Sequence, residues 1–146
     1  MRDPSLEILV VDDNPKLGRL VSELFNRIGF AHVDTATNGA EALEMLRTGN
    51  YGLVVSDLEM SPMDGLQLLK QVKSSEELFR TAFILTEASI TFEQVTTAHA
   101  YGVDAFLLKP FDLTLLKTKL KTVLGRRARR KKIALDWASA EVSDVA

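Results

Sequence analysis

Residues 7–14, with the sequence EILVVDDN, indicate how this chain folds. Glu7–Val11 is a short, apolar, β-branched run, which is typical of a strand buried on both faces. Two acids, Asp12 and Asp13, follow it directly. Asn14-Pro15 then opens a helix, because Asn can cap the first turn and Pro suits the first helical position. The stretch therefore predicts a buried strand that delivers two carboxylates to the start of a helix.

The same alternation of apolar strand and amphipathic helix recurs along the chain. Further strands are predicted at 32–36, 53–56, 82–85 and 105–108, and helices with their caps at 15–29, 38–49, 64–72, 91–102 and 112–123. Strands of mainly apolar residues belong to parallel sheets that helices cover on both faces. The sequence thus predicts an α/β fold, a doubly wound five-stranded parallel sheet with five flanking helices.

Composition and length exclude several classes of protein. The chain has 146 residues, a formal net charge of −2 and no cysteine, which excludes disulfide scaffolds and cysteine-based zinc or nucleophile sites. No apolar run is long enough for a membrane span, and the N-terminus lacks the pattern of a secretory signal. A cytoplasmic location is therefore expected.

Charge is distributed unevenly between the two parts of the chain. Residues 1–125 carry twelve basic and seventeen acidic groups, whereas residues 126–146 carry six basic and three acidic groups. We expect one folded domain over 1–125 and a basic extension over 126–146 that is partly helical or disordered. The run RRARRKK at 126–132 is a solvated continuation of the last helix or a segment that docks on a partner. Nucleic acid is the least favoured partner, because six positive charges without a folded nucleic-acid-binding domain give only non-specific affinity.

Polar residues with matching chemistry follow four of the predicted strands. Asp12-Asp13, Asp57, Thr86 and Lys109 each stand at a strand's carboxyl end, and these ends meet at one edge of a parallel sheet, where ligands bind. Three carboxylates would repel one another without a cation. Oxygen ligands without His or Cys favour Mg²⁺ over zinc. The sequence therefore predicts a magnesium site at this edge.

The same residues suit phosphoryl transfer. The Asp57 carboxylate can act as a nucleophile toward phosphorus. Mg²⁺ and the Lys109 ammonium would neutralise charge on the transferred oxygens, and the Thr86 hydroxyl can donate a hydrogen bond to one of them.

Five motifs in this order give the chain a family resemblance. They are LVVDDN at 9–14, VVSDLEM at 54–60, MDGLQLL at 63–69, ILT at 84–86 and FLLKPF at 106–111. Over about residues 5–125 the chain resembles the receiver domains of two-component response regulators, especially single-domain CheY-like ones. The resemblance implies the strand order 2-1-3-4-5 and a signalling switch that catalyses only its own phosphorylation and dephosphorylation.

The resemblance also implies roles for the acidic residues. Asp57 matches the phosphoacceptor, and Asp12 and Asp13 match the acid pair that holds Mg²⁺, with Asp13 the more direct ligand. Glu59, two residues past the acceptor, would lend its backbone carbonyl to the metal.

The remaining roles implied by the resemblance concern switching and partners. Thr86 and Lys109 match the hydroxyl and ammonium that approach the phosphoryl group, and the Lys109-Pro110 peptide is expected to be cis. Phe106 matches the switch aromatic, although an aromatic in a buried strand can equally be ordinary core. The phosphodonor would be a sensor histidine kinase or a phosphotransfer protein. The downstream target would bind the face formed by the fourth helix, fifth strand and fifth helix, because 21 tail residues are too few for an effector domain unless the chain continues.

Three residues depart from the family pattern. Pro62 stands one position later than usual, Glu59 adds an acid beside the metal, and Glu87 follows Thr86 where a small residue is usual. These departures affect the expected rate and lifetime of phosphorylation.

Two alternative functions use the same residues. A phosphohydrolase of the haloacid-dehalogenase kind would also use an Asp nucleophile, but its Asp-x-Asp pair follows the first strand, whereas Asp57-Leu-Glu59 follows the third. A phosphorylation-independent adaptor would keep the fold only for docking, and Glu87 and Pro62 favour it.

Overall fold

The computed structural model describes residues 5–145, with side chains for 5–133, 135 and 136. It confirms the predicted α/β fold: one five-stranded parallel sheet in the order β2-β1-β3-β4-β5. The strands are β1 (Glu7–Val11), β2 (His32–Ala36), β3 (Leu53–Asp57), β4 (Ala82–Glu87) and β5 (Ala105–Leu108). The helices are α1 (Pro15–Ile28), α2 (Gly39–Thr48), α3 (Gly65–Ser74), α4 (Phe92–Tyr101) and α5 (Leu113–Val145).

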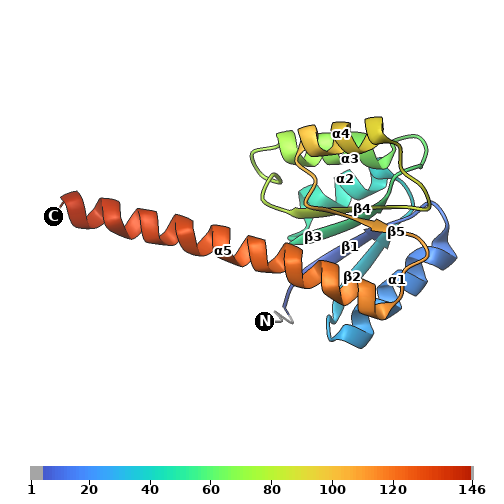
Figure 1. Ribbon diagram of the computed structural model, residues 1–146, viewed down its shortest axis with the longest axis horizontal. Coiled ribbons are helices and arrows are strands. Elements are labelled where there is room, and N and C mark those ends of the chain that lie inside the picture. The colour runs from blue at the N-terminus through green and yellow to red at the C-terminus, as the bar shows by residue number, and fades with distance from the viewer. Residues whose placement is uncertain (1–4, 146) are drawn as a thin grey trace.

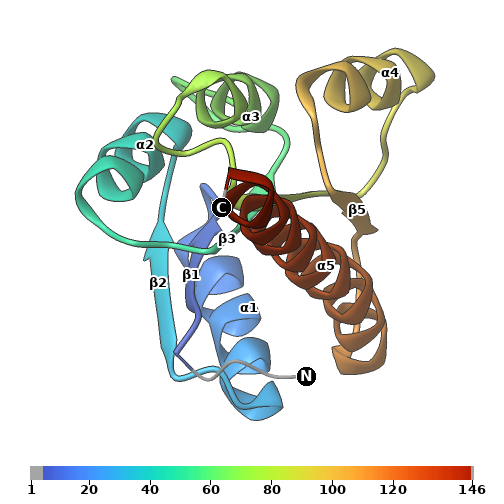
Figure 2. The same ribbon diagram turned by 90° about the vertical axis from the view of Figure 1, so that its left-hand side faces the viewer.

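Alternate residues of the central strands build two separate cores. Ile8 and Val10 of β1 pack with residues of α1 and α5, whereas Leu9 and Val11 pack with residues of α2 and α3. Figure 2 shows the result, with α1 and α5 on one face of the sheet and α2, α3 and α4 on the other. This double coverage explains why β1, β3 and β4 are almost wholly apolar. The edge strands β2 and β5 are more exposed.

Helix caps are formed mostly as the sequence predicts. The Asn14 side chain accepts from Lys16 N at the start of α1, and Gly29 ends this helix with a left-handed φ of 118°. Reciprocal capping boxes start α3 at Asp64 and α4 at Thr91.

The residues that start α2, Asn38 and Glu41, do not form a reciprocal capping box, although their types and spacing match that motif. Asn38 does accept from Glu41 N, but the Glu41 carboxylate turns one residue further back. Its Oε2 accepts from both N and Oγ1 of Thr37, at 3.1 and 2.8 Å. Thr37 offers two donors, its backbone N and its hydroxyl, whereas a capping box would use only the backbone N of Asn38. The second donor accounts for the turn of the Glu41 carboxylate toward Thr37.

Two strands end later than predicted. β3 includes Asp57 and β4 extends to Glu87, because the parallel ladder continues through the pair Asp57↔Thr86. The proposed acceptor and the proposed switch hydroxyl are therefore direct neighbours across two central strands.

Helix α5 is much longer than the segment predicted to pack on the sheet. It continues without interruption from Leu113 to Val145, and Figure 1 shows its C-terminal half projecting from the body. The extension over 126–145 is therefore helical in the structure rather than disordered. Among residues 5–145, no helix combines the length and apolar character needed to cross a bilayer.

Candidate functional site

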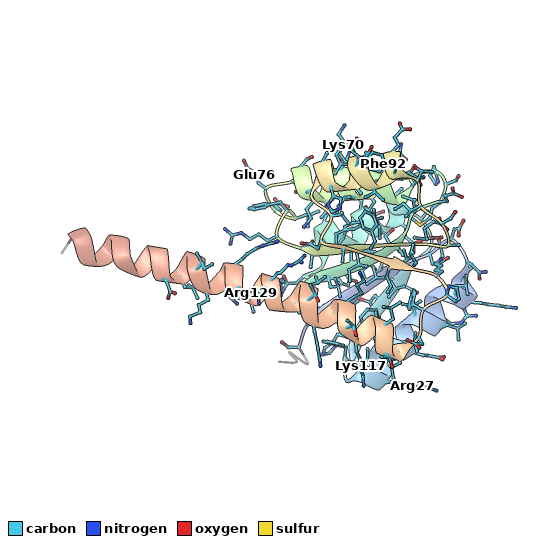
Figure 3. The ribbon with its side chains drawn as sticks, viewed as in Figure 1. Arg27, Lys70, Glu76, Phe92, Lys117 and Arg129 are labelled. Carbon is cyan, nitrogen blue, oxygen red and sulfur yellow. The ribbon has the colours of Figure 1, made fainter. Side chains whose placement is uncertain are left out.

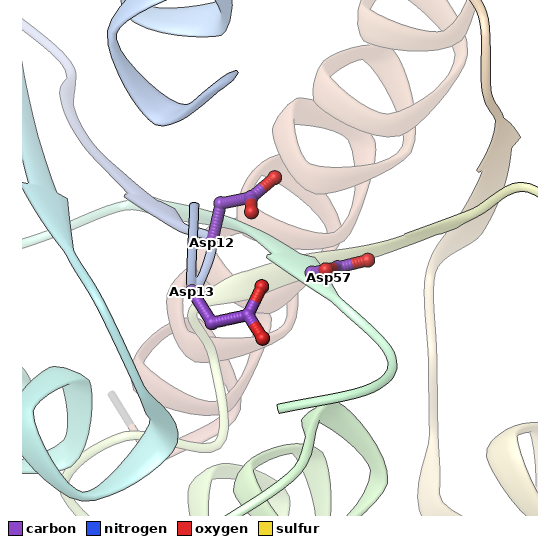
Figure 4. A group of neighbouring side chains, drawn as sticks. All are labelled: Asp12, Asp13 and Asp57. Atoms are coloured by element: carbon purple, nitrogen blue, oxygen red, sulfur yellow. The ribbon is translucent and has the colours of Figure 1, made fainter. Parts of the chain in front are cut away.

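The carboxyl edge of the sheet gathers the three predicted acids. Asp12 and Asp13 follow β1 and Asp57 ends β3; one carboxylate oxygen from each lies within 4.8 Å of the others. Figure 4 shows Asp12 and Asp13 side by side with Asp57 next to them. Asp12 and Asp57 are buried, whereas Asp13 is exposed. The group is therefore anchored in the core and open to solvent at Asp13.

Backbone amides fix the two buried carboxylates. Asn14 N donates to Asp12 Oδ1 at 2.9 Å, and Leu58 N donates to Asp57 Oδ1 at 3.1 Å. Leu58 N also donates to the carbonyl of Thr86 at 3.0 Å, so the turn after β3 is bonded to β4. These contacts hold the carboxylates in place through the strand ends themselves.

Lys109 brings a positive charge into the same site. Its Nζ lies 3.1 Å from Asp57 Oδ1 and 3.2 Å from Asp12 Oδ2. The residue follows β5, its backbone N donates to the carbonyl of Glu87, and the Lys109-Pro110 peptide is cis, as the resemblance implies. The ammonium therefore lies between the two buried acids.

Burial and neighbouring charges set the protonation of Asp57 and Lys109. Burial raises the pKa of Asp57 from 3.8 to about 6, against the lowering effect of Lys109 and with further raising by Asp12 and Glu87. Burial alone would lower the pKa of Lys109, but its hydrogen bonds and charge interactions with Asp57 and Asp12 raise it. At neutral pH both groups are charged, so Asp57 keeps an available lone pair.

The other predicted site residues surround this group at different distances. Thr86 is buried opposite Asp57 in the sheet. Glu87 is half-buried, and its Oε1 accepts from Ala88 N at 2.6 Å, so its carboxylate turns back onto its own backbone. Phe106 is not in the acidic group: it pairs with Leu85 in the sheet and packs edge-to-face on His99 of α4, with ring centroids 5.6 Å apart.

Glu59 and Pro62 lie in the loop that follows Asp57. The Glu59 side chain is exposed, and among the described residues its carboxylate is not part of the metal-ligand group. The Ser61-Pro62 peptide is cis.

One residue that packs against Asp57 was not recognised from the sequence. A Cβ at Gly65 would clash with the carbonyl oxygen of Asp57. The motif MDG marked this glycine only as part of a helix start; its contact with the end of β3 follows from the long-range packing of α3 on the sheet.

The donor set fits a hard divalent cation. Three carboxylates converge within 4.8 Å, with no His or Cys among them. Mg²⁺ accepts such oxygen ligands and keeps several waters, for which the exposed side at Asp13 leaves room.

Residues 8–121 match the model of the response regulator receiver domain family, in agreement with this fold and site. The chain belongs to this family. It is a CheY-like receiver, a signalling protein rather than an enzyme, and this membership disfavours the phosphohydrolase alternative.

Individual relatives of this receiver support the assignment. It is 35% identical over 122 residues to the chemotaxis protein CheY-3 of Vibrio cholerae, covering 84% of this chain and 94% of the relative. The solved structure of CheY4 from Vibrio cholerae superposes with a TM-score of 0.76 at 27% identity, covering 81% and 98% of the two chains. A complex described as CheX-CheY-BeF3-Mg+2, from Borrelia burgdorferi, matches with a TM-score of 0.74 at 25% identity, covering 82% and 89%.

Proposed function

We propose that this receiver accepts a phosphoryl group on Asp57 from a sensor histidine kinase or a phosphotransfer protein, in a Mg²⁺-dependent step, and signals through protein contacts. The observation that carries the proposal is the buried Asp57 carboxylate in contact with Lys109 and within 4.8 Å of two further acids. Because receivers serve kinases, a histidine phosphodonor is the natural partner, and a cytoplasmic location would suit it.

In the proposed reaction a carboxylate oxygen of Asp57 forms a bond to phosphorus while the donor's phosphorus–nitrogen bond breaks. The electron pair of the broken bond leaves with the donor imidazole, which takes up a proton. Lys109 is placed to balance the negative charge that the phosphoryl oxygens bring next to Asp57. The raised pKa of Asp57, about 6, leaves the nucleophile ionised at neutral pH.

Asp12, Asp13 and Asp57 are the side chains that would hold Mg²⁺, with the backbone carbonyl of Glu59 as a further proposed ligand. The bound ion would neutralise the oxygens of the phosphoryl group during transfer. The Borrelia burgdorferi relative, whose complex carries BeF3 and Mg+2, supports this choice of metal.

The proposed output follows from the residues around the acceptor. Thr86 and Lys109 would move toward the phosphoryl oxygens. The movement of Thr86 would change the space beside β4 that is open to the Phe106 side chain. This is a population shift between two packings of the same chain. The face formed by α4, β5 and α5 carries exposed apolar side chains, Phe92 (Figure 3), Leu108 and Leu115. A protein target that covers these side chains would read the change.

The test is intact-mass measurement after incubation with acetyl phosphate, with and without Mg²⁺. We expect a single phosphoryl adduct that requires both Mg²⁺ and Asp57 and is absent from Asp57→Asn. Phosphate release is followed in the same sample, so that a short-lived adduct is also detected. The absence of both the adduct and Mg²⁺-dependent phosphate release would contradict the proposal.

Two variants separate metal binding from general damage. Asp13→Asn removes an exposed carboxylate of the acidic group and should abolish the adduct. Glu59→Gln changes an exposed side chain whose proposed role uses only the backbone, so it should keep the adduct.

A docking adaptor that works without phosphorylation is the second candidate. Glu87 favours it, because this acid lies close enough to Asp57 to raise its pKa and would repel a phosphodonor. Equal partner binding by wild type and Asp57→Ala would support the adaptor, whereas binding that depends on acetyl phosphate would exclude it.

A further inference from the structure

Residues 113–132 of α5 form a basic segment in an otherwise acidic chain. The segment contains nine basic side chains and no acid, whereas residues 1–112 carry nine basic and seventeen acidic groups. Within the segment the positive charges therefore repel one another, and no acid of the segment neutralises them. A helix with charges of one sign only creates a local field that attracts anions.

Three arginines of this segment contact the body at the root of the extension. Arg130 Nη1 lies 3.5 Å from Asp104 Oδ1, and Arg126 Nη1 lies 3.5 Å from the carbonyl oxygen of Asp104. The guanidinium of Arg127 lies beside Gly52, just before β3. These contacts hold the root of the extension at the amino edge of the sheet, and the other six basic side chains take no part in them.

The outer face of α5 presents a row of exposed cations. Leu116, Leu120 and Val123 mark the opposite face, which is buried on the body. The cationic row consists of Lys117, Lys121, Arg129 and Lys132. Among the residues with described side chains, none of these four lies within ion-pair distance of an acid. Figure 3 shows Lys117 where α5 lies along the body and Arg129 where the helix leaves it.

Small residues, rather than large apolar ones, separate the cations of this row. The hydroxyls of Thr118 and Thr122 donate to the carbonyls of Thr114 and Thr118, one turn earlier. Gly125 and Ala128 add no large side chain. A protein partner usually needs a central apolar or aromatic anchor, and a helix that lies on a membrane needs an apolar face to insert. The row offers neither, so it suits a ligand that is bound by charge alone.

A phosphodiester backbone is such a ligand. Lys and Arg side chains bind it by releasing the counterions condensed on it, without any apolar contact. The cationic row is about 22 Å long, because Lys117 and Lys132 belong to one continuous helix. The row carries no aromatic side chain on which the bases of a single strand would stack. These features favour a duplex, whose phosphates lie along a stiff rod.

We propose that the cationic row of α5 binds the phosphate backbone of double-stranded nucleic acid without reading its sequence. The run at 126–132 alone predicts only non-specific affinity for nucleic acid, and the structure aligns Lys117 and Lys121 with it on one continuous helix. The expected binding is weak, with a Kd of about 1–100 µM at physiological salt. Asp57 takes no part in this binding, so the proposal stands or falls separately from the proposed function.

Fluorescence anisotropy of a labelled DNA duplex of about 20 base pairs, titrated with the 146-residue chain, tests the proposal. We expect binding at about 50 mM KCl and a Kd about a hundredfold higher at about 200 mM, because four phosphate contacts give a slope of log K against log salt of about −3.6. No binding at the lower salt with up to about 200 µM protein, or a Kd independent of salt, would overturn the proposal. Tighter binding to a single strand of the same length, or to phosphatidylserine vesicles, would also overturn it.

Two double variants with the same loss of charge test the assignment to α5. Lys121→Ala with Arg129→Ala removes two cations of the row, and should weaken binding by about tenfold and lower the salt slope by about 2. Arg47→Ala with Lys70→Ala removes two exposed cations from α2 and α3, on the other face of the sheet, and should change the Kd by less than about twofold. Equal effects of the two double variants would overturn the assignment. Circular dichroism verifies that each variant remains folded.

Discussion

At the scale of single residues, the proposed acceptor is a carboxylate held where ionisation is unfavourable. Asp57 is buried, and its pKa is raised to about 6 despite its contact with Lys109. The unfavourable ionisation of Asp57 should lower the stability of the metal-free protein.

Asp57→Asn should stabilise the metal-free receiver near neutral pH. Between pH 3.8 and about 6 the folded state keeps a proton that the unfolded state has lost, so the free energy of unfolding falls as pH rises through this window. Above it we expect the variant to be more stable by about 1–2 kcal/mol, a rise in Tm of about 2–6 °C. The difference should vanish near pH 4. Thermal unfolding in EDTA at pH 4 and pH 7 measures this difference, with the exposed Glu59→Gln as control. The same Tm for Asp57→Asn and wild type at both pH values would contradict the prediction.

Gly65 is the residue that lets α3 approach Asp57 at the end of β3. Gly65→Ala would drive a Cβ into the Asp57 carbonyl, a backbone atom that cannot move aside, and should cost about 2 kcal/mol or more. Gly125→Ala is the matched control, since its Cβ meets only Arg129 Nη1 at 3.6 Å. Within a helix that change should stabilise by about 0.5–1 kcal/mol. Urea unfolding compares the two, and equal effects would refute the steric argument.

At the scale of elements, a single ion pair joins four segments. Lys73 of α3 donates to Asp104, before β5, and to the carbonyl of Thr81, before β4. Asp104 also accepts from Phe83 N at 2.7 Å and contacts Arg130 of α5. The acid thus links the sheet, the helix layer and the root of the extension.

Asp104→Ala should destabilise the fold by about 2–4 kcal/mol, because the Lys73 ammonium loses its carboxylate partner and keeps only carbonyl acceptors, and the Phe83 amide loses its acceptor. Asp104→Asn keeps an oxygen for the amide and should cost less. Glu76→Ala removes an exposed acid on the same side of the molecule, labelled in Figure 3, and should be near neutral. Urea titrations rank the three, and a neutral Asp104→Ala would show that the network carries no stability.

The elements and the acidic site could be predicted from the sequence because their signals are local. Apolar runs mark the strands, and Asp57 and Lys109 stand where those runs end. The pair Lys73–Asp104 could not be predicted, since its partners are 31 residues apart and neither belongs to a motif. The length of α5 was equally hidden, because RRARRKK is compatible with both a helix and an unstructured tail. Only the contacts with Asp104 and Gly52 show which basic residues face the body.

At the scale of the whole molecule, ligand binding and folding are coupled. The three acids come from β1 and β3, which are adjacent only in the folded sheet, so the site exists only in the native state. Mg²⁺ should therefore raise the free energy of unfolding by about 2.7 kcal/mol at a concentration one hundred times its Kd, and the Tm should rise with it.

Thermal scans over a Mg²⁺ titration check this coupling. The rise should disappear in Asp13→Asn and persist in Glu59→Gln, because only the first removes a carboxylate from the group. The same rise in both variants would place the ion elsewhere on the acidic body.

The straight, uninterrupted course of α5 has a mechanical consequence. From Arg126 to Val145 the helix is a rigid arm of about 30 Å, pivoting where it meets Asp104, close to the start of β5. A tilt of about 10° at that pivot displaces the far end by about 5 Å, so a change too small to notice in the sheet becomes a large excursion at the tip. Any rearrangement of β5 that tilts α5 is thereby amplified into a sideways displacement of the far end of the helix.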